Sequence, residues 1–146
     1  MGILRHSLVS RFTPTFAEPH MSTPAASTAT FFRWADVPSE QVKPDISRKL
    51  ITGDRIMLAE VKLQRGCIVP QHAHVHEQMT YVLDGCLRLT VGEDGATSYD
   101  LRGGEVVVLP SNVPHAAEAL EDTRVIDVFS PPREDWLNRT DAYLRR

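Results

Sequence analysis

The stretch that decides the fold is GCIVPQHAHVHEQMTYVLDG, Gly66–Gly85 of a 146-residue chain. Residues 72–78 hold three histidines, a glutamate and a glutamine, and strand-like runs flank them on both sides. Residues i and i+2 of a β-strand point the same way, so His72 and His74 would present two imidazoles to one face, about 7 Å apart at the backbone. Paired imidazoles are common ligands of divalent metals, so this spacing predicts part of a metal site.

Short runs of β-forming residues, separated by Gly, Asp and Pro, extend on either side of this stretch. In CLRLTVG, Leu87, Leu89 and Val91 alternate with less apolar residues, as in a half-buried strand. Strands at this spacing, with no helical period between them, predict an all-β sandwich or barrel. The clearest expected strands are residues 56–63, 79–83, 87–91, 97–101, 106–109 and 124–129.

One short helix is expected after Pro132, within the stretch REDWLNRTDAYL, residues 133–144. Three large side chains in it, Trp136, Leu137 and Tyr143, are expected to pack against the barrel rather than to bind a ligand.

Composition narrows the class of protein. A net charge of −3 argues against a nucleic-acid-binding surface. No apolar run approaches the roughly 20 residues that a membrane span needs. Two cysteines, Cys67 and Cys86, make no disulfide framework, and we expect both to be reduced packing residues of a cytoplasmic protein.

Residues 1–30 differ from the rest of the chain, because they are rich in Ser, Thr, Ala and Pro and contain one acid, Glu18. Such a composition buries too little apolar area to offset its ordering entropy, so it predicts a disordered extension before a single domain at residues 31–146. Arg5 and Arg11 without early acids are compatible with a transit segment, and Met21 is an alternative start.

Two spaced motifs resemble those of the cupins. Gly66, five residues, His72-x-His74, three residues, Gln78, six residues and Gly85 resemble the first cupin motif, with Gln in place of the usual Glu. The stretch GEVVVLPSNVPHAAEA resembles the second, although Asn112 and Ala119 stand where Gly and Asn are common. The resemblance covers about residues 50–133. It implies a single cupin barrel (a double-stranded β-helix or jelly roll) and a divalent metal held by His72, His74, Gln78 and His115.

The fourth ligand has an alternative. Glu77 is a better metal ligand by chemistry, and a shift of one residue in register would bring it inward. The motif spacing favours Gln78, which would share the inward face with Thr80 and Val82. We expect His76 to lie at the rim, where a substrate contact is also possible.

A ligand set of three neutral imidazoles and a neutral amide would leave the full charge of the ion uncompensated. Such a centre should be a strong Lewis acid for an anionic or enolate oxygen and, with iron, a poor reductant of O₂. This favours isomerase, lyase or cyclase chemistry over oxygenation. Zinc, nickel, iron and manganese all tolerate the set.

The stretch VIDVFSPPRED contains a second group of candidate residues, with Val125, Asp127 and Phe129 on one strand face. An aspartate between two apolar residues on an inward face is costly unless it is paired or functional. One interpretation is an ion pair between Asp127 and Arg133. The other makes Asp127 a general acid or base, Phe129 an apolar wall and Arg133 a clamp for a substrate carboxylate.

The pattern Asp-x-Phe-x-x-x-Arg, together with the Gln ligand, resembles the pectin-degradation (KdgF-like) cupins, which open the ring of 4,5-unsaturated uronates. The resemblance implies that Asp127, Phe129 and Arg133 act on a small, anionic substrate, and cupins of this size are commonly homodimers. The alternatives are a polyketide cyclase-like cupin, an iron-dependent dioxygenase and a small-molecule-binding cupin without turnover.

Overall fold

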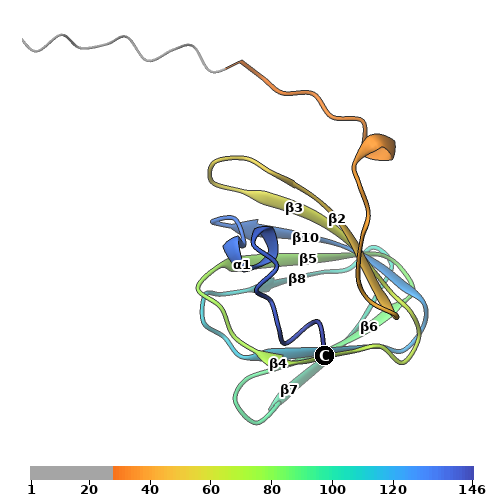
Figure 1. Cartoon of the computed structure of the whole chain (residues 1–146). Helices are drawn as coiled ribbons and strands as arrows, with labels where there is room; N and C mark the ends of the chain where they lie inside the picture. The colour runs from red at the N-terminus through yellow and green to blue at the C-terminus, as the bar shows by residue number, and fades with distance from the viewer. Residues whose placement is uncertain (1–27) are drawn as a thin grey trace, which may run out of the picture. The chain divides into compact units, whose positions relative to one another are not determined.

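Two antiparallel sheets lie opposite each other in the computed structural model, which describes residues 28–146 (Figure 1). The larger sheet comprises β1 (Glu40–Lys43), β2 (Ile46–Thr52), β3 (Met57–Leu63), β5 (Glu77–Asp84), β8 (Val106–Leu109) and β10 (Thr123–Ser130). The smaller comprises β4 (Ile68–His72), β6 (Cys86–Val91), β7 (Thr97–Arg102) and β9 (His115–Ala119). The strand orders are β1-β2-β3-β10-β5-β8 and β4-β9-β6-β7, so the predicted all-β jelly roll is confirmed.

All six expected strands occur, as β3, β5, β6, β7, β8 and β10, and their ends differ from the prediction by at most two residues. Strands β1, β2 and β9 were not predicted, and in the last two the sequence hides the alternating pattern. In β2, Arg48 occupies a buried position that an apolar residue would ordinarily mark. The sequence of β9, HAAEA, is poor in β-formers, and its pairing with β4 and β6 makes it a strand.

The inward faces of both sheets form the core. In β10, Val125, Asp127 and Phe129 are buried and alternate with more exposed neighbours. In β5, Gln78, Thr80 and Val82 are buried in the same way. Because β10 pairs with β5 in antiparallel register, Asp127 lies opposite Thr80, and Phe129 lies opposite Gln78. Polar side chains of β5 and β10 therefore meet in the interior.

Gly85 forms the tight turn between β5 and β6. Its φ of +87° lies in the left-handed region, and a Cβ there would collide with the carbonyl oxygen of Asp122. Only glycine satisfies both conditions, so the passage of the chain from β5 in the larger sheet to β6 in the smaller sheet depends on it.

A short α-helix, α1 (Glu134–Leu137), follows β10, and residues 138–146 continue in turns. The predicted C-terminal helix is thus confirmed, with four residues. In Figure 1, α1 and the residues after it run across the open end between the two sheets.

A single 3₁₀ turn, η1 (Trp34–Asp36), precedes β1. Residues Phe32–Arg146 form one compact unit. The predicted extension at residues 1–30 falls mostly outside the described residues, and residues 28–30 are exposed without regular structure. In the described part of the chain, no helix is long and apolar enough to cross a membrane.

Candidate metal centre

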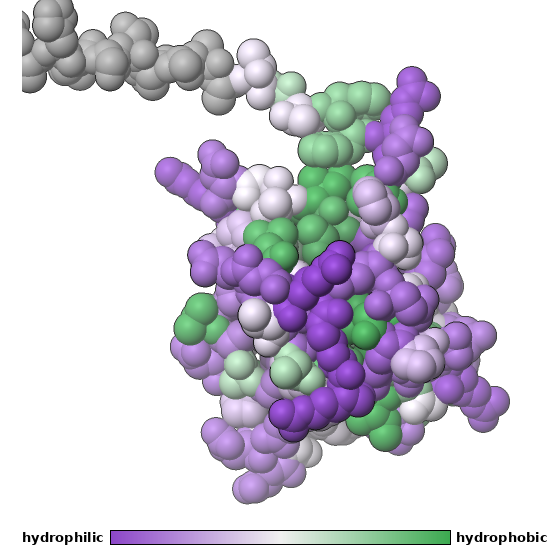
Figure 2. Space-filling view, viewed as in Figure 1, coloured by the Kyte–Doolittle hydropathy of each residue, from purple (hydrophilic) through white to green (hydrophobic). Residues whose placement is uncertain are grey.

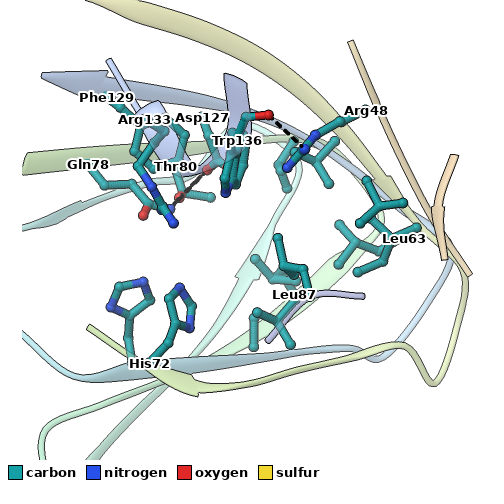
Figure 3. A pocket seen from close by; sticks show the side chains of 18 of the residues that line it. Arg48, Leu63, His72, Gln78, Thr80, Leu87, Asp127, Phe129, Arg133 and Trp136 are labelled. Carbon is teal, nitrogen blue, oxygen red and sulfur yellow. Dashed lines mark hydrogen bonds between the residues drawn. The ribbon is translucent and has the colours of Figure 1, made fainter. Parts of the chain in front are cut away.

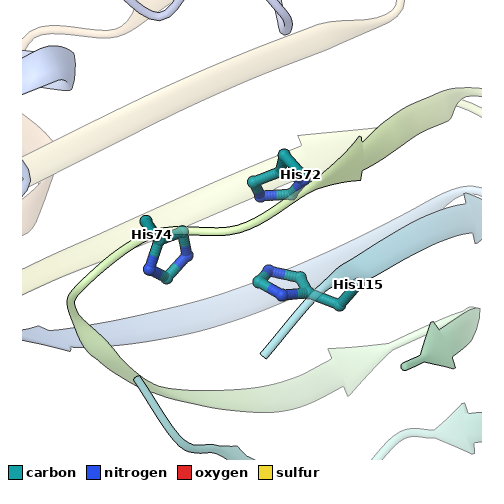
Figure 4. A group of neighbouring side chains, drawn as sticks. All are labelled: His72, His74 and His115. Carbon is teal, nitrogen blue, oxygen red and sulfur yellow. The ribbon is translucent and has the colours of Figure 1, made fainter. Parts of the chain in front are cut away.

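Three histidines meet inside the open end of the barrel (Figure 4). His72 is the last residue of β4 and His115 the first of β9, and the antiparallel pairing of these strands places them opposite each other. His74 follows two residues after His72. One ring nitrogen of each histidine lies within 4.8 Å of the others, a separation that a single ion can span.

Backbone carbonyls orient all three rings. The Nδ1 atoms of His72, His74 and His115 lie 2.9, 3.1 and 2.8 Å from the carbonyl oxygens of Pro70, His76 and Val113. A carbonyl only accepts, so each Nδ1 carries the proton and each Nε2 is left with a free lone pair. The Nε2 of His115 is buried and has no hydrogen-bond partner among residues 28–146.

Burial keeps these imidazoles neutral. It lowers the pKa of His72 to about 4 and that of His74 to about 3, and the pKa of His115 is lowered as well, mainly by burial. Neutral imidazole is the form that binds metal.

Gln78 supplies the strongest indication of a cation. Its Nε2 donates to Thr80 Oγ1 at 2.9 Å and to Asp127 Oδ1 at 3.2 Å, which turns Oε1 toward His74. That oxygen lies 3.1 Å from His74 Nε2. With the proton of His74 on Nδ1, two acceptors face each other, an arrangement that a shared cation would relieve. Glu77, the alternative ligand, is exposed on the opposite face of β5.

Asp127 is buried at the centre of β10 and accepts hydrogen bonds on Oδ1 from Thr80 and Gln78. Burial raises its pKa to about 6, although those hydrogen bonds act in the opposite direction. The Oδ2 atom has no hydrogen-bond partner within residues 28–146, and Asp127 lines the inner cavity.

The ion pair considered between Asp127 and Arg133 is wrong, because Arg133 pairs with Asp135, two residues further along the chain. Its Nε and Nη2 atoms donate to the two carboxylate oxygens of Asp135 at 2.8 and 2.6 Å. The guanidinium is buried, and these bonds outweigh the effect of burial, so the pKa of Arg133 is raised. The pair is local because the turn into α1 places residues 133 and 135 together, which β-strand alternation does not indicate.

Phe129 forms an apolar wall beside His74 and Arg133. Its ring is 5.8 Å from that of His74, and the Arg133 guanidinium lies 5.2 Å from its centroid. It also packs edge-on against Trp136, 5.0 Å away between centroids.

Two cavities meet at this site. An inner cavity of about 70 Å³ lies between the sheets, and His72, His115, Gln78, Asp127 and Arg133 line it. Figure 3 shows His72 on the opposite side of this cavity from Gln78, Asp127 and Arg133. A wider vestibule of about 840 Å³ lies outside it. The half-buried His76 lines the vestibule, which places it at the rim.

Sequence reasoning assigned only packing to Tyr143, yet the structure places it in the site. Its ring stacks on that of His72 with centroids 4.3 Å apart, and its hydroxyl accepts a hydrogen bond from Arg133 at 2.9 Å. No periodic pattern around residue 143 indicates this position, because the residues after α1 form turns.

Facing sheets with a histidine triad at their open end define the class of protein. The family model for the cupin domain matches residues 59–129. The structure of KdgF from Halomonas sp. aligns with a TM-score of 0.69 at 34% identity, over 75% of this chain and 99% of that chain. The chain belongs to the cupin family.

Other relatives are more distant. An RmlC-like cupin from Shewanella frigidimarina NCIMB 400 aligns with a TM-score of 0.68 at 27% identity, over 75% of this chain and 96% of that chain. Oxalate decarboxylase OxdC from Bacillus subtilis (strain 168) is 27% identical over 77 residues, which are 51% of this chain. The match spans only 20% of the length of OxdC.

Proposed function

We propose that this cupin is a metal-dependent enzyme of the isomerase or lyase type, which moves a proton on an unsaturated uronate or a similar small sugar acid. One observation carries the proposal. The inner cavity has two histidines of the triad, His72 and His115, on one side and Asp127 and Arg133 on the other. Figure 3 shows His72 facing Asp127 and Arg133 across this space. The similarity to KdgF along 99% of the Halomonas protein supports the uronate class.

The histidine triad and Gln78 are the residues that would hold a divalent ion. Zinc, nickel, iron and manganese all accept this donor set. A bound ion would supply a Lewis acid that polarises a substrate oxygen. Bacillus subtilis oxalate decarboxylase, a protein of the same fold, has Mn(II) centres, which is in keeping with a divalent ion in this cupin.

Arg133 would bind the substrate carboxylate. Nε and both hydrogens of Nη2 are committed to Asp135 and Tyr143, so Nη1 supplies the remaining donors. Phe129, beneath the guanidinium, closes the site with an apolar surface.

Asp127 would move the proton. Thr80 and Gln78 occupy Oδ1, which leaves Oδ2 as the atom that would take up or release a proton. Opening an unsaturated uronate ring requires loss of the anomeric hydroxyl proton, cleavage of the bond from the anomeric carbon to the ring oxygen, and protonation of the enol carbon. Composition is unchanged, so one acid–base group and no co-reactant suffice.

The direct test follows the ultraviolet absorbance of the conjugated enol after metal-loaded protein is mixed with unsaturated uronate. Decay faster than in buffer is expected, with loss of activity after chelation and recovery on adding back a divalent ion. Consumption of O₂ by the iron-loaded protein would instead indicate a dioxygenase. Thermal stabilisation by the uronate without any product would indicate a binding protein.

Asp127→Asn tests the proton-transfer step. The amide oxygen still accepts from Thr80 and Gln78, so the orientation of Gln78 and the metal affinity should be kept. Turnover should fall by about 100-fold or more, since a general acid or base contributes that much. The check is kcat together with metal content, and full activity in this variant would remove Asp127 from the mechanism.

A further inference from the structure

Three residues, His72, Arg133 and Tyr143, line both the inner cavity and the vestibule. They therefore form the partition between the solvent side and the side where Gln78 and Asp127 lie. Any ligand that bridges the two spaces contacts this partition. Of these three residues, Tyr143 is the one that has no role in the proposed function.

Tyr143 is held in place from both sides along the chain. Asp141 is buried and accepts hydrogen bonds from Arg48 and Arg145, each at 2.7 Å. Leu144 is buried in the core. A segment fixed at residues 141, 144 and 145 presents Tyr143 to the site in a defined position.

The hydroxyl of Tyr143 has a proton to give. Arg133 can only donate, so the phenol oxygen accepts the 2.9 Å hydrogen bond from its Nη2 atom. The O–H of Tyr143 remains, and no acceptor receives it among the residues that the structure describes. The partition thus carries two kinds of uncommitted donor, the Tyr143 hydroxyl and the Arg133 Nη1 group.

We propose that Tyr143 contacts the substrate, donating its hydroxyl hydrogen to the anionic group that Arg133 Nη1 also binds. The inference rests on the proposed function and adds a residue to it. A carboxylate offers two oxygens, each able to accept one of these donors. The same tyrosine stacks on His72, so one side chain supports a candidate metal ligand and binds the substrate.

Tyr143→Phe is the decisive variant, because it keeps the ring on His72 and removes only the hydroxyl. The probe is galacturonate, a saturated uronate that cannot undergo the reaction, titrated calorimetrically into zinc-loaded protein. Loss of a hydrogen bond to a charged group should weaken binding by about tenfold or more. Tyr99→Phe removes an exposed hydroxyl on β7 and should leave the affinity unchanged.

A spectroscopic measurement distinguishes a contact between the Tyr143 hydroxyl and the substrate from support of the His72 ring by the Tyr143 ring. Cobalt absorption bands, which report ligand geometry, should be the same in Tyr143→Phe as in the unaltered protein and should change in Tyr143→Leu, which loses the stacked ring. Thermal unfolding of each variant shows whether it is folded.

The outcomes are distinct. Galacturonate affinity unaltered in Tyr143→Phe would overturn the contact and leave the proposed reaction standing. Galacturonate binding that depends on Tyr143, without turnover of the unsaturated uronate, would support the contact and count against the reaction. Absence of galacturonate binding to the unaltered protein would overturn both the uronate class and the contact.

Discussion

Gln78 sets the charge of the candidate metal centre. It is an amide among three imidazoles, and its hydrogen bonds to Thr80 and Asp127 determine which of its atoms faces His74. A carboxylate in this position would neutralise one unit of ionic charge and would place an oxygen beside Asp127. The choice of amide therefore affects both metal binding and the neighbouring acid.

We expect Gln78→Glu to bind zinc at least about tenfold more tightly, because a negative charge approaches the ion in a buried site. Turnover should fall, since the ion becomes a weaker Lewis acid. Competition with a chromophoric chelator measures the affinity. Glu77→Gln is the matched control on the outward face and should leave the zinc affinity unchanged; weaker zinc binding in this variant would mean that Glu77 is the ligand.

Cys67 gives a prediction about thiol chemistry. Burial, with a hydrogen bond to Asp45, raises its pKa to about 12, so the thiol stays protonated throughout the physiological range. In native protein, iodoacetamide should leave Cys67 unlabelled at pH 8, and unfolding should expose it. Mass spectrometry of the labelled peptides provides the measurement, and rapid native labelling would contradict the assigned burial.

At the scale of elements, a buried ionic cluster attaches the C-terminal segment to β2. Arg48 donates to Asp141 at 2.7 Å and to Glu40 at 2.9 Å, and its guanidinium lies 4.5 Å from the centroid of Trp136. Both Arg48 and Asp141 are almost fully buried. The pair therefore fixes the segment that carries Tyr143.

Asp141→Ala should lower the free energy of unfolding by about 3 kcal/mol, because it leaves a buried guanidinium without one of its partners. For a domain of this size the melting temperature should fall by about 10 °C. Asp100→Ala removes the partner of Arg88 in an exposed pair on β6 and β7 and should change the melting temperature little. Calorimetry of both variants decides whether burial makes the difference.

Strands whose apolar and polar residues alternate with a period of two can be predicted from the sequence, whereas features without such a pattern cannot. Alternation along β5 and β10 places Gln78, Asp127 and Phe129 inside, and the observed strands agree with it. Two features have no such signal. The partner of Arg133 and the position of Tyr143 depend on turns around α1, and turn geometry brings together residues that strand alternation does not relate.

At the scale of the whole molecule, the outer face of the larger sheet is unusually apolar. One cross-strand row runs through Ile51, Leu58, Val128, Met79 and Val108, and the next row contains Ile126, Tyr81 and Val106. Met79, Tyr81, Val106 and Val108 are each at least 39% exposed. Figure 2 shows a largely hydrophilic surface around the open end, with hydrophobic side chains gathered over β2 and β3.

We propose that this face joins two copies of the chain in a homodimer. A contiguous apolar surface of this kind marks an interaction site, and two-fold symmetry would bury the same face of both copies. Val108→Lys should shift the protein from dimer to monomer, measured by light scattering after size exclusion. Ser98→Lys, on exposed β7, should not, and a monomeric unaltered protein would contradict the proposal.

The proposed ligands come from both sheets, since the histidines belong to β4, β9 and the loop that follows β4, and Gln78 belongs to β5. A bound ion would consequently cross-link the two sheets. Thermal unfolding that separates the sheets would then require the ion to dissociate. Heat resistance should then rise with the free ion concentration. Cells poor in that ion would hold a form of the protein that is easier to unfold and degrade.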